Sequence, residues 1–222
     1  MSGFEVVRVG LSDDPSSYLE LRRVGEREGR GVHCDLASIS LRGGRAEARA
    51  MPIVKALGDA ATVVDATAGL LGDAFLLAAA GFRVVAVERS LEVYRVAEDG
   101  LARAQRDPRL CALLEDRLSV VHADAREWLD QRARTDAAPD AIVLDPMFPS
   151  KRKKSALPRK EMVLLRELVG VDEDAALLLA AARRCARQRV VLKRGDDSPI
   201  LAQPDWAVEG TTVRFDVFRG DS

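Results

Sequence analysis

The sequence lacks most features of disulfide-rich, metal-binding or membrane proteins. It contains three cysteines and two histidines in 222 residues. Cys34, Cys111 and Cys185 are widely spaced, with no C-x-x-C pair, so we expect neither a disulfide framework nor a zinc site. No apolar run approaches the length of a membrane span, and the amino-terminal residues do not have a signal-peptide pattern. We therefore expect a cytoplasmic protein without a metal or a membrane partner.

An excess of charge of one sign is also missing. The chain has 34 Lys and Arg against 35 Asp and Glu, a net charge of -1, so affinity for nucleic acid would have to come from a local patch. Aromatic residues make up 5%, whereas hydrophobic residues make up 47% and charged residues 31%. This balance is typical of a folded globular protein, and the length suits one α/β domain with a small appendage.

The hydrophobic pattern divides the chain near residue 58. Residues 1–58 are irregular and predict a small β-rich appendage; its expected elements are strands at Phe4–Val9, Tyr18–Val24 and Gly31–Leu36 and a helix at Arg45–Leu57. Residues 59–222 alternate strands and helices, which predicts a mostly parallel sheet with helices on both faces. Its expected strands are Thr62–Ala66, Arg83–Glu88, Leu118–His122, Ala141–Asp145 and Arg189–Lys193, and its expected helices are Asp73–Ala80, Leu91–Gln105, Ala125–Arg134, Arg159–Leu168 and Glu173–Arg187.

The last two β runs, Trp206–Glu209 and Val213–Phe218, are separated by a short turn and should pair antiparallel. A mostly parallel seven-stranded sheet that ends in such a hairpin resembles the Rossmann-like class I S-adenosylmethionine-dependent methyltransferase fold. Other doubly wound folds also have antiparallel edge strands.

A glycine-containing turn follows the first strand of this region. Asp65 ends the strand, and Gly69 and Gly72 precede a helix, where small residues let the backbone approach a ligand. The spacing differs from the G-x-G-x-x-G dinucleotide fingerprint. Tight packing could require these glycines equally well, and Asp73 could be a helix cap.

Two further acids follow strands. Glu88 ends the second strand, where a carboxylate can accept hydrogen bonds from the ribose of S-adenosylmethionine or NAD; the alternative is an exposed loop acid. Asp124 follows the third strand. It could accept a hydrogen bond from an adenine amino group, cap the helix that begins at Ala125, or do both.

The fourth strand runs into Asp145-Pro146-Met147-Phe148-Pro149. An exocyclic amine is a poor nucleophile because its lone pair is delocalised into the ring. The Asp145 carboxylate and the Pro146 carbonyl can accept its hydrogens, orient the nitrogen and stabilise developing positive charge. Phe148 can stack on a splayed-out base. The alternative is a proline-rich structural turn.

A basic segment follows this loop. Its cationic residues are Lys151, Arg152, Lys153, Lys154, Arg159 and Lys160. A basic run is usually solvated surface, but its position beside the predicted pocket favours contact with nucleic-acid phosphates. Lys193 and Arg194, at the end of the fifth strand, would add to the same edge.

Four segments together resemble the bacterial ribosomal RNA small-subunit methyltransferase J family. They are VVDATAGLLGDAF, AVERS, LDPMFPSKRKKSALPRKEM and RVVLKR, within residues 62–201. The resemblance implies S-adenosylmethionine-dependent N2-methylation of one guanosine near the 3′ end of 16S ribosomal RNA. By motif position, it also implies cofactor contacts at Gly72, Asp73, Glu88, Arg89, Asp124, Ala125 and Asp145.

Two positions depart from the family pattern. The family usually has G-L-G-R-D where this chain has Gly69-Leu70-Leu71-Gly72-Asp73, and it usually has Ser-Ser in place of Asp124-Ala125. The alternatives are an amino-methyltransferase for DNA adenine, a protein glutamine or a small amine, an NAD-linked oxidoreductase, or a noncatalytic RNA-binding protein on the same scaffold. We expect ribosomal RNA or the small ribosomal subunit as partner, and a monomer or weak dimer.

Overall fold

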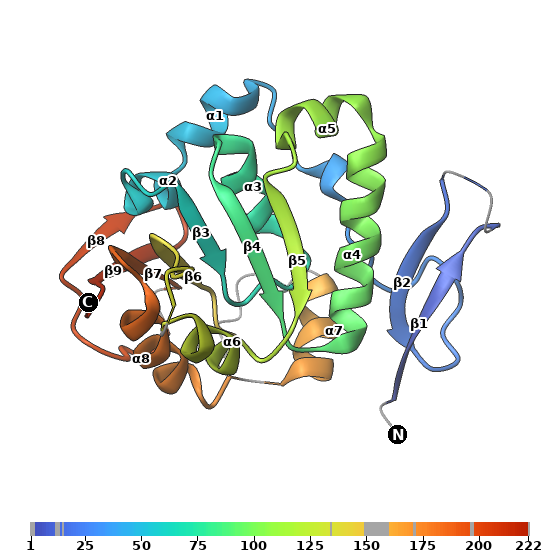
Figure 1. The fold of residues 1–222 in the computed structure, drawn as a ribbon. Coiled ribbons are helices and arrows are strands. Elements are labelled where there is room, and N and C mark those ends of the chain that lie inside the picture. Colours follow the sequence, from blue (N-terminus) through green and yellow to red (C-terminus); the bar gives the residue numbers. More distant parts are fainter. Residues whose placement is uncertain are drawn as a thin grey trace.

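The structure is a computed structural model that describes residues 3–11, 14, 16–133, 135–148, 160–170, 172–195 and 198–221. Its main feature is a seven-stranded sheet in the order β5-β4-β3-β6-β7-β9-β8 (Figure 1). The first five strands in this order, β5, β4, β3, β6 and β7, are parallel. Strand β9 is antiparallel to both β7 and β8. The strands are β3 (Thr62–Asp65), β4 (Arg83–Glu88), β5 (Leu118–His122), β6 (Ala141–Leu144), β7 (Arg189–Arg194), β8 (Trp206–Glu209) and β9 (Arg214–Arg219).

This architecture confirms the predicted fold class. Every residue of β6 is buried, as expected for a central parallel strand covered on both faces. The order of the strands along the chain reverses between β3 and β6, and open α/β sheets bind ligands at such a switch point, beyond the carboxyl ends of the strands.

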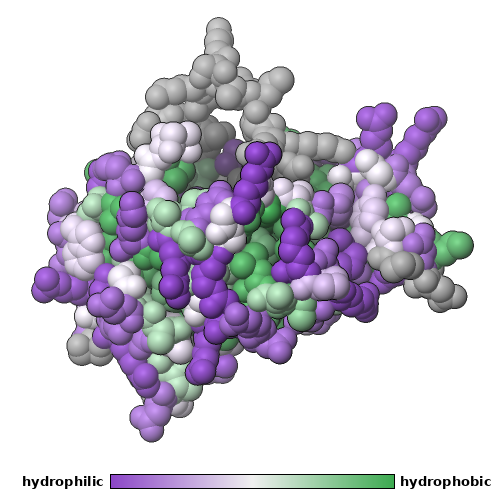
Figure 2. Space-filling model, turned by 90° about the horizontal axis from the view of Figure 1, so that it is seen from above, coloured by the Kyte–Doolittle hydropathy of each residue, from purple (hydrophilic) through white to green (hydrophobic). Residues whose placement is uncertain are grey.

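Helices cover both faces of the sheet (Figure 1). One apolar cluster includes Phe75 and Leu77 from α3, and the other includes Trp128 and Leu129 from α6 and Leu178 from α8. The helices of this region are α3 (Gly72–Ala80), α4 (Leu91–Arg106), α5 (Pro108–Leu114), α6 (Ala125–Arg132), α7 (Lys160–Val169) and α8 (Ala175–Cys185). In Figure 2, hydrophobic residues on the outer surface form small patches among hydrophilic ones.

The amino-terminal segment contains a β-hairpin, a short 3₁₀ helix and two short helices. The hairpin lies beside α4 (Figure 1), and Leu19 N donates a hydrogen bond to Asp99 Oδ2 of α4 over 3.0 Å. Its elements are β1 (Phe4–Val9), β2 (Tyr18–Arg23), the 3₁₀ helix (Leu36–Ser38), α1 (Gly44–Ala50) and α2 (Pro52–Leu57). The division of the chain into domains at residue 58 stays a prediction.

Three local predictions were wrong. The expected strand Gly31–Leu36 is an isolated bridge between Leu21 and Val32 followed by the 3₁₀ helix. The expected helix Arg45–Leu57 is two helices, because the residue before Pro52 has an extended backbone (φ -64°, ψ 141°). Helix α5 was missed, although Asp107 caps it and a proline occupies its first turn.

Within the described ranges, no helix combines the length and the apolar character that a membrane crossing requires. The same residues contain no group of three or more His, Cys, Asp or Glu side chains that could hold a metal ion.

Candidate active site

A cavity with about 620 Å³ of empty space opens at the carboxyl ends of β3, β4, β5 and β6. This space includes solvent at the open mouth, and the cavity lies at the switch point of the sheet, where open α/β sheets bind their ligands. Its lining includes Thr67, Gly69, Glu88, Arg89, Asp124, Ala125, Asp145, Met147 and Asp172. The structure thus brings together predicted site residues from four separate strand ends.

The glycine turn leaves space for a ligand beside its backbone. Gly69 has a left-handed backbone (φ +50°), and a Cβ atom at Gly69 or Gly72 would meet no heavy atom within 4 Å. Leu71, at the family's second glycine, is also left-handed (φ 64°, ψ 16°) and fully buried, a conformation that costs about 1–2 kcal/mol for a non-glycine residue. Leu71 therefore adopts a backbone conformation that glycine takes more readily than any other residue.

Glu88 is buried against this turn and is not an exposed loop acid. It is 7% exposed; its Oε2 accepts from Gly69 N over 2.9 Å, and its Oε1 accepts from Ser90 N over 2.8 Å. Burial raises the pKa of Glu88, although these hydrogen bonds oppose the rise. The carboxylate is fixed at the cavity wall and retains lone pairs for a ligand.

Lys193 connects two carboxylates beside the cavity. Its Nζ lies 2.6 Å from Asp73 Oδ2 and 2.9 Å from Asp145 Oδ2. Burial alone would lower the pKa of Lys193, but Asp145 and Asp73 outweigh it and raise that pKa. Asp73 therefore binds Lys193, and α3 has no side-chain cap.

Burial and nearby negative charge raise the pKa of two neighbouring acids, Asp65 and Asp145. Asp65 is 2% exposed, and burial, followed by the charge of Asp73, raises its pKa to about 7. The Asp145 side chain is 45% exposed. Partial burial raises the pKa of Asp145 against the opposing effect of Lys193, and Asp73 adds to the rise. The site is thus rich in carboxylates and suited to a cationic ligand.

The Asp145 loop (residues 145–148) is held from two directions. Asp145 N donates to Thr67 Oγ1 over 2.7 Å. Met147 N donates to Asp172 Oδ2 over 2.6 Å, and Asp172 N donates to Met147 O over 3.0 Å. Pro146 is buried, whereas Phe148 is half-buried and packs on the apolar cluster of α6 and α8. Asp172 was not predicted, because an acid just before a helix resembles an ordinary cap.

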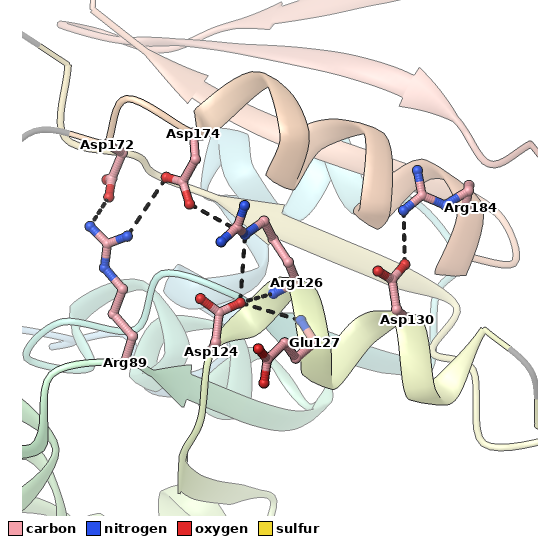
Figure 3. Close-up of polar contacts among 8 residues, drawn as sticks. All are labelled: Arg89, Asp124, Arg126, Glu127, Asp130, Asp172, Asp174 and Arg184. Atoms are coloured by element: carbon pink, nitrogen blue, oxygen red, sulfur yellow. Dashed lines mark hydrogen bonds and ion pairs between the residues drawn. The ribbon is translucent and has the colours of Figure 1, made fainter.

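A chain of ion pairs links this loop to the other side of the cavity (Figure 3). Arg89 pairs with Asp172 (2.5 Å) and Asp174 (3.6 Å), and Arg126 pairs with Asp174 (3.3 Å) and Asp124 (3.6 Å). Asp124 also caps α6 by accepting hydrogen bonds from two backbone amides, so its predicted capping role is confirmed. Partly exposed pairs contribute little stability individually, and their main effect here is to fix relative positions.

Most of the predicted RNA contacts are in the segment that follows the Asp145 loop. Lys151, Arg152, Lys153, Lys154 and Arg159 lie outside the described residues, as does Pro149, and Lys160 is the first residue of α7.

Lys193 and Arg194 have other partners. Lys193 binds the two carboxylates described above. Arg194 is 8% exposed; its Nε lies 2.7 Å from Asp216 Oδ2, and its guanidinium also donates to the Ser198 and Pro199 carbonyls. The expectation of phosphate contacts at these two positions therefore does not enter our proposal.

The residues around the cavity fit S-adenosylmethionine. Carboxylates suit its positively charged sulfonium and amino groups, Glu88 suits a ribose, and the open space beside Gly69 and Gly72 allows close approach. A parallel sheet with an antiparallel end, a cavity at its switch point and an Asp-Pro-x-Phe loop define a class I S-adenosylmethionine-dependent methyltransferase.

Comparison with known proteins supports the same class and narrows it. A family described as putative SAM-dependent methyltransferases matches residues 9–220. Ribosomal RNA small subunit methyltransferase J of Photobacterium profundum is 41% identical, over 95% of this chain and 90% of the relative. The protein of that name from Nitrosococcus oceani is 44% identical, over 78% of this chain and 69% of the relative. The protein belongs to the ribosomal RNA small subunit methyltransferase J family, and S-adenosylmethionine is its cofactor.

A solved structure agrees with this assignment. The crystal structure of a SAM-dependent methyltransferase from Neisseria gonorrhoeae has a TM-score of 0.72 and 29% identity to this chain. It is matched over 100% of this chain and 84% of its own length.

Proposed function

We propose that the protein transfers the methyl group of S-adenosylmethionine to the exocyclic N2 amine of a guanosine in 16S ribosomal RNA. The observation that carries this proposal is the Asp145 loop at the wall of the cofactor cavity, with an acid and a backbone carbonyl in adjacent positions. The names of the relatives support small-subunit ribosomal RNA as substrate. The chemistry of the loop supports an amino nitrogen as acceptor.

The cofactor would be held by residues that end or follow four strands. Glu88 would accept from the ribose hydroxyls, Asp124 and Ala125 would contact the adenine, and the acids Asp65 and Asp73 would face the methionine portion. The remaining proposed contacts are Gly69, Gly72, Arg89 and Asp145. When bound, S-adenosylmethionine supplies an electrophilic methyl group on a positively charged sulfur.

The target amine would be held by the Asp145 loop. The Asp145 carboxylate and the Pro146 carbonyl accept the two amino hydrogens, which orients the nitrogen and stabilises the positive charge that develops on it. Lys193 occupies Oδ2 of the carboxylate and so restricts how Asp145 can turn. Phe148 stacks on the extruded base, and water at the cavity mouth takes the surplus proton.

The basic segment would contribute the RNA affinity. We include Lys151, Arg152, Lys153, Lys154, Arg159 and Lys160 as contacts to RNA phosphates. Neutralising the first four should weaken RNA binding and flatten its salt dependence, because fewer counterions are released. A filter-binding titration at several salt concentrations measures both, and equal salt slopes for variant and parent would contradict this role.

The central test is methyl transfer by the parent and by Asp145→Ala. Labelled methyl groups are mapped in 16S RNA from cells that lack and then regain the gene, and the purified proteins are assayed on the unmodified RNA. We expect one guanosine to regain N2-methylation with the parent and none with Asp145→Ala. Asp130→Ala is the control, because Asp130 pairs with Arg184 away from the cavity (Figure 3). Methylation by Asp145→Ala at the parent rate would overturn the mechanism, and absence of the mark in complemented cells would overturn the substrate.

A further inference from the structure

The side chain of Asp172 acts on one peptide group of the Asp145 loop. Its Oδ2 accepts a hydrogen bond from Met147 N over 2.6 Å, its own N–H donates to Met147 O over 3.0 Å, and its Oδ1 lies 2.5 Å from Arg89 Nη2. The Asp172 side chain is 13% exposed. A charged group is thus aimed at the backbone of the loop from outside it.

Met147 N–H and the Pro146 carbonyl belong to the same peptide group. The group is planar, and the 146–147 bond is trans, so the N–H and the C=O point in opposite directions. The bond from Met147 N–H to Asp172 therefore directs the Pro146 carbonyl away from Asp172. An anion at the N–H also polarises the peptide group and makes its carbonyl oxygen a stronger acceptor.

A capping role does not explain this carboxylate. Helix α8 begins at Ala175 with Asp174 as its cap residue, and the hydrogen bond that Asp172 accepts from Ala175 uses its backbone carbonyl. The Asp172 side chain instead accepts from Met147 N at one oxygen and pairs with Arg89 at the other; Figure 3 shows the pair with Arg89. Arg89 in turn pairs with Asp174, which limits rotation of the whole group.

We propose that Asp172 is a positioning residue for methyl transfer: it fixes and polarises the Pro146–Met147 peptide so that the Pro146 carbonyl accepts a hydrogen from the target amine. This inference rests on the proposed function of the Asp145 loop and adds to it a residue that acts through the backbone. Arg89 holds the Asp172 carboxylate in place and joins it to the cofactor side of the cavity.

The test compares Asp172→Ala, Asp172→Asn and Arg89→Met with the parent on unmodified 16S RNA. Asp172→Ala removes the acceptor, and we expect kcat to fall about thirtyfold, as for loss of one charge-assisted hydrogen bond. Asp172→Asn keeps an acceptor for Met147 N–H without the charge, so it should recover part of this loss. Arg89→Met leaves the bond to Met147 but removes the partner that holds the Asp172 carboxylate, so it should lower kcat less than Asp172→Ala does and also raise the Kd of S-adenosylmethionine.

Three measurements separate positioning from a structural role. They are the kcat for methyl transfer, the Kd of the cofactor measured by calorimetry, and the temperature of thermal unfolding. Asp130→Asn, which removes the charge from an exposed ion pair, is the matched control and should behave like the parent. A kcat for Asp172→Ala within about twofold of the parent would overturn the inference. Equal kcat losses in the Ala and Asn variants, with parallel losses of cofactor affinity, would also overturn it. Absence of methylation by the folded parent would instead refute the proposed function.

Discussion

Replacing Lys193 with methionine removes a positive charge from the centre of the site while keeping a long apolar side chain. In the parent, the ammonium contacts Asp73 and Asp145 at 2.6 Å and 2.9 Å. An exposed ion pair contributes up to about 1 kcal/mol, and removing one partner of a buried pair costs about 3–5 kcal/mol. Lys193 and Asp73 are 23% and 22% exposed and Asp145 is 45% exposed, so we expect an intermediate loss of stability of about 2 kcal/mol.

The same substitution should change how activity depends on pH. Lys193 lowers the pKa of Asp145 against the raising effect of burial, so its loss raises that pKa further. Protonated Asp145 is a poor acceptor for the amine, and transfer is therefore lost as pH falls through the pKa of Asp145. The acid limb of the kcat profile should accordingly move to higher pH in Lys193→Met.

Single-turnover methyl transfer to unmodified 16S RNA, measured from weakly acidic to alkaline pH, tests this reasoning. Lys193→Arg, which keeps the charge, should retain the parent profile better than Lys193→Met. Unfolding in urea measures the stability loss separately. If Lys193→Met and the parent have superimposable acid limbs, Lys193 does not control the ionisation of Asp145.

Three further predictions concern buried charged groups. Glu88→Gln replaces one acceptor oxygen by an amide that faces a backbone N–H, so it should weaken S-adenosylmethionine binding about tenfold in calorimetry; an unchanged Kd would exclude Glu88 as a ligand. Burial raises the pKa of Asp65 from 3.8 to about 7, so the stabilising effect of the protonated form is present below the unfolded pKa and is lost as pH rises through the folded pKa. Asp65→Asn should therefore gain stability relative to the parent as the pH rises from 3.8 to about 7, by up to about 4 kcal/mol. A difference in urea unfolding that does not depend on pH would contradict the raised pKa. Arg194→Met leaves Asp216 with Arg214 as its remaining partner, so it should lower the free energy of unfolding by about 3 kcal/mol without changing RNA affinity. Weaker RNA binding by the folded variant would instead support a phosphate contact at Arg194.

The sheet could be predicted because its strands have a strong local signature. Ala141–Leu144 is apolar on both faces, Thr62–Asp65 has buried valines at its centre, and both strands alternate with helices. Residues that directly follow such strands lie at one edge of the sheet. For this reason the positions of Glu88, Asp124 and Asp145 around one cavity followed from the order of the elements.

Contacts between distant residues could not be predicted in the same way. Asp172 lies 25 residues from Met147, and Lys193 lies 120 residues from Asp73. These pairs depend on which strands are neighbours and on where each loop returns, and residue spacing determines neither. Lys193 looked like part of a basic edge because its carboxylate partners come from the first turn of α3 and from the end of β6. The interruption of the helix before Pro52, by contrast, could have been predicted, because a proline restricts the backbone of the preceding residue.

The two hydrogen bonds to Glu88 have a consequence for the thermodynamics of cofactor binding. Gly69 N and Ser90 N hold the two carboxylate oxygens, so the side chain has already lost its rotational freedom when the protein folds. Immobilising a flexible side chain on binding costs about 0.5–1.5 kcal/mol, and a ribose that meets Glu88 does not incur this cost. In the proposed binding mode, part of the entropy loss needed for recognition therefore belongs to folding, and the cofactor would meet an acceptor that needs no rearrangement.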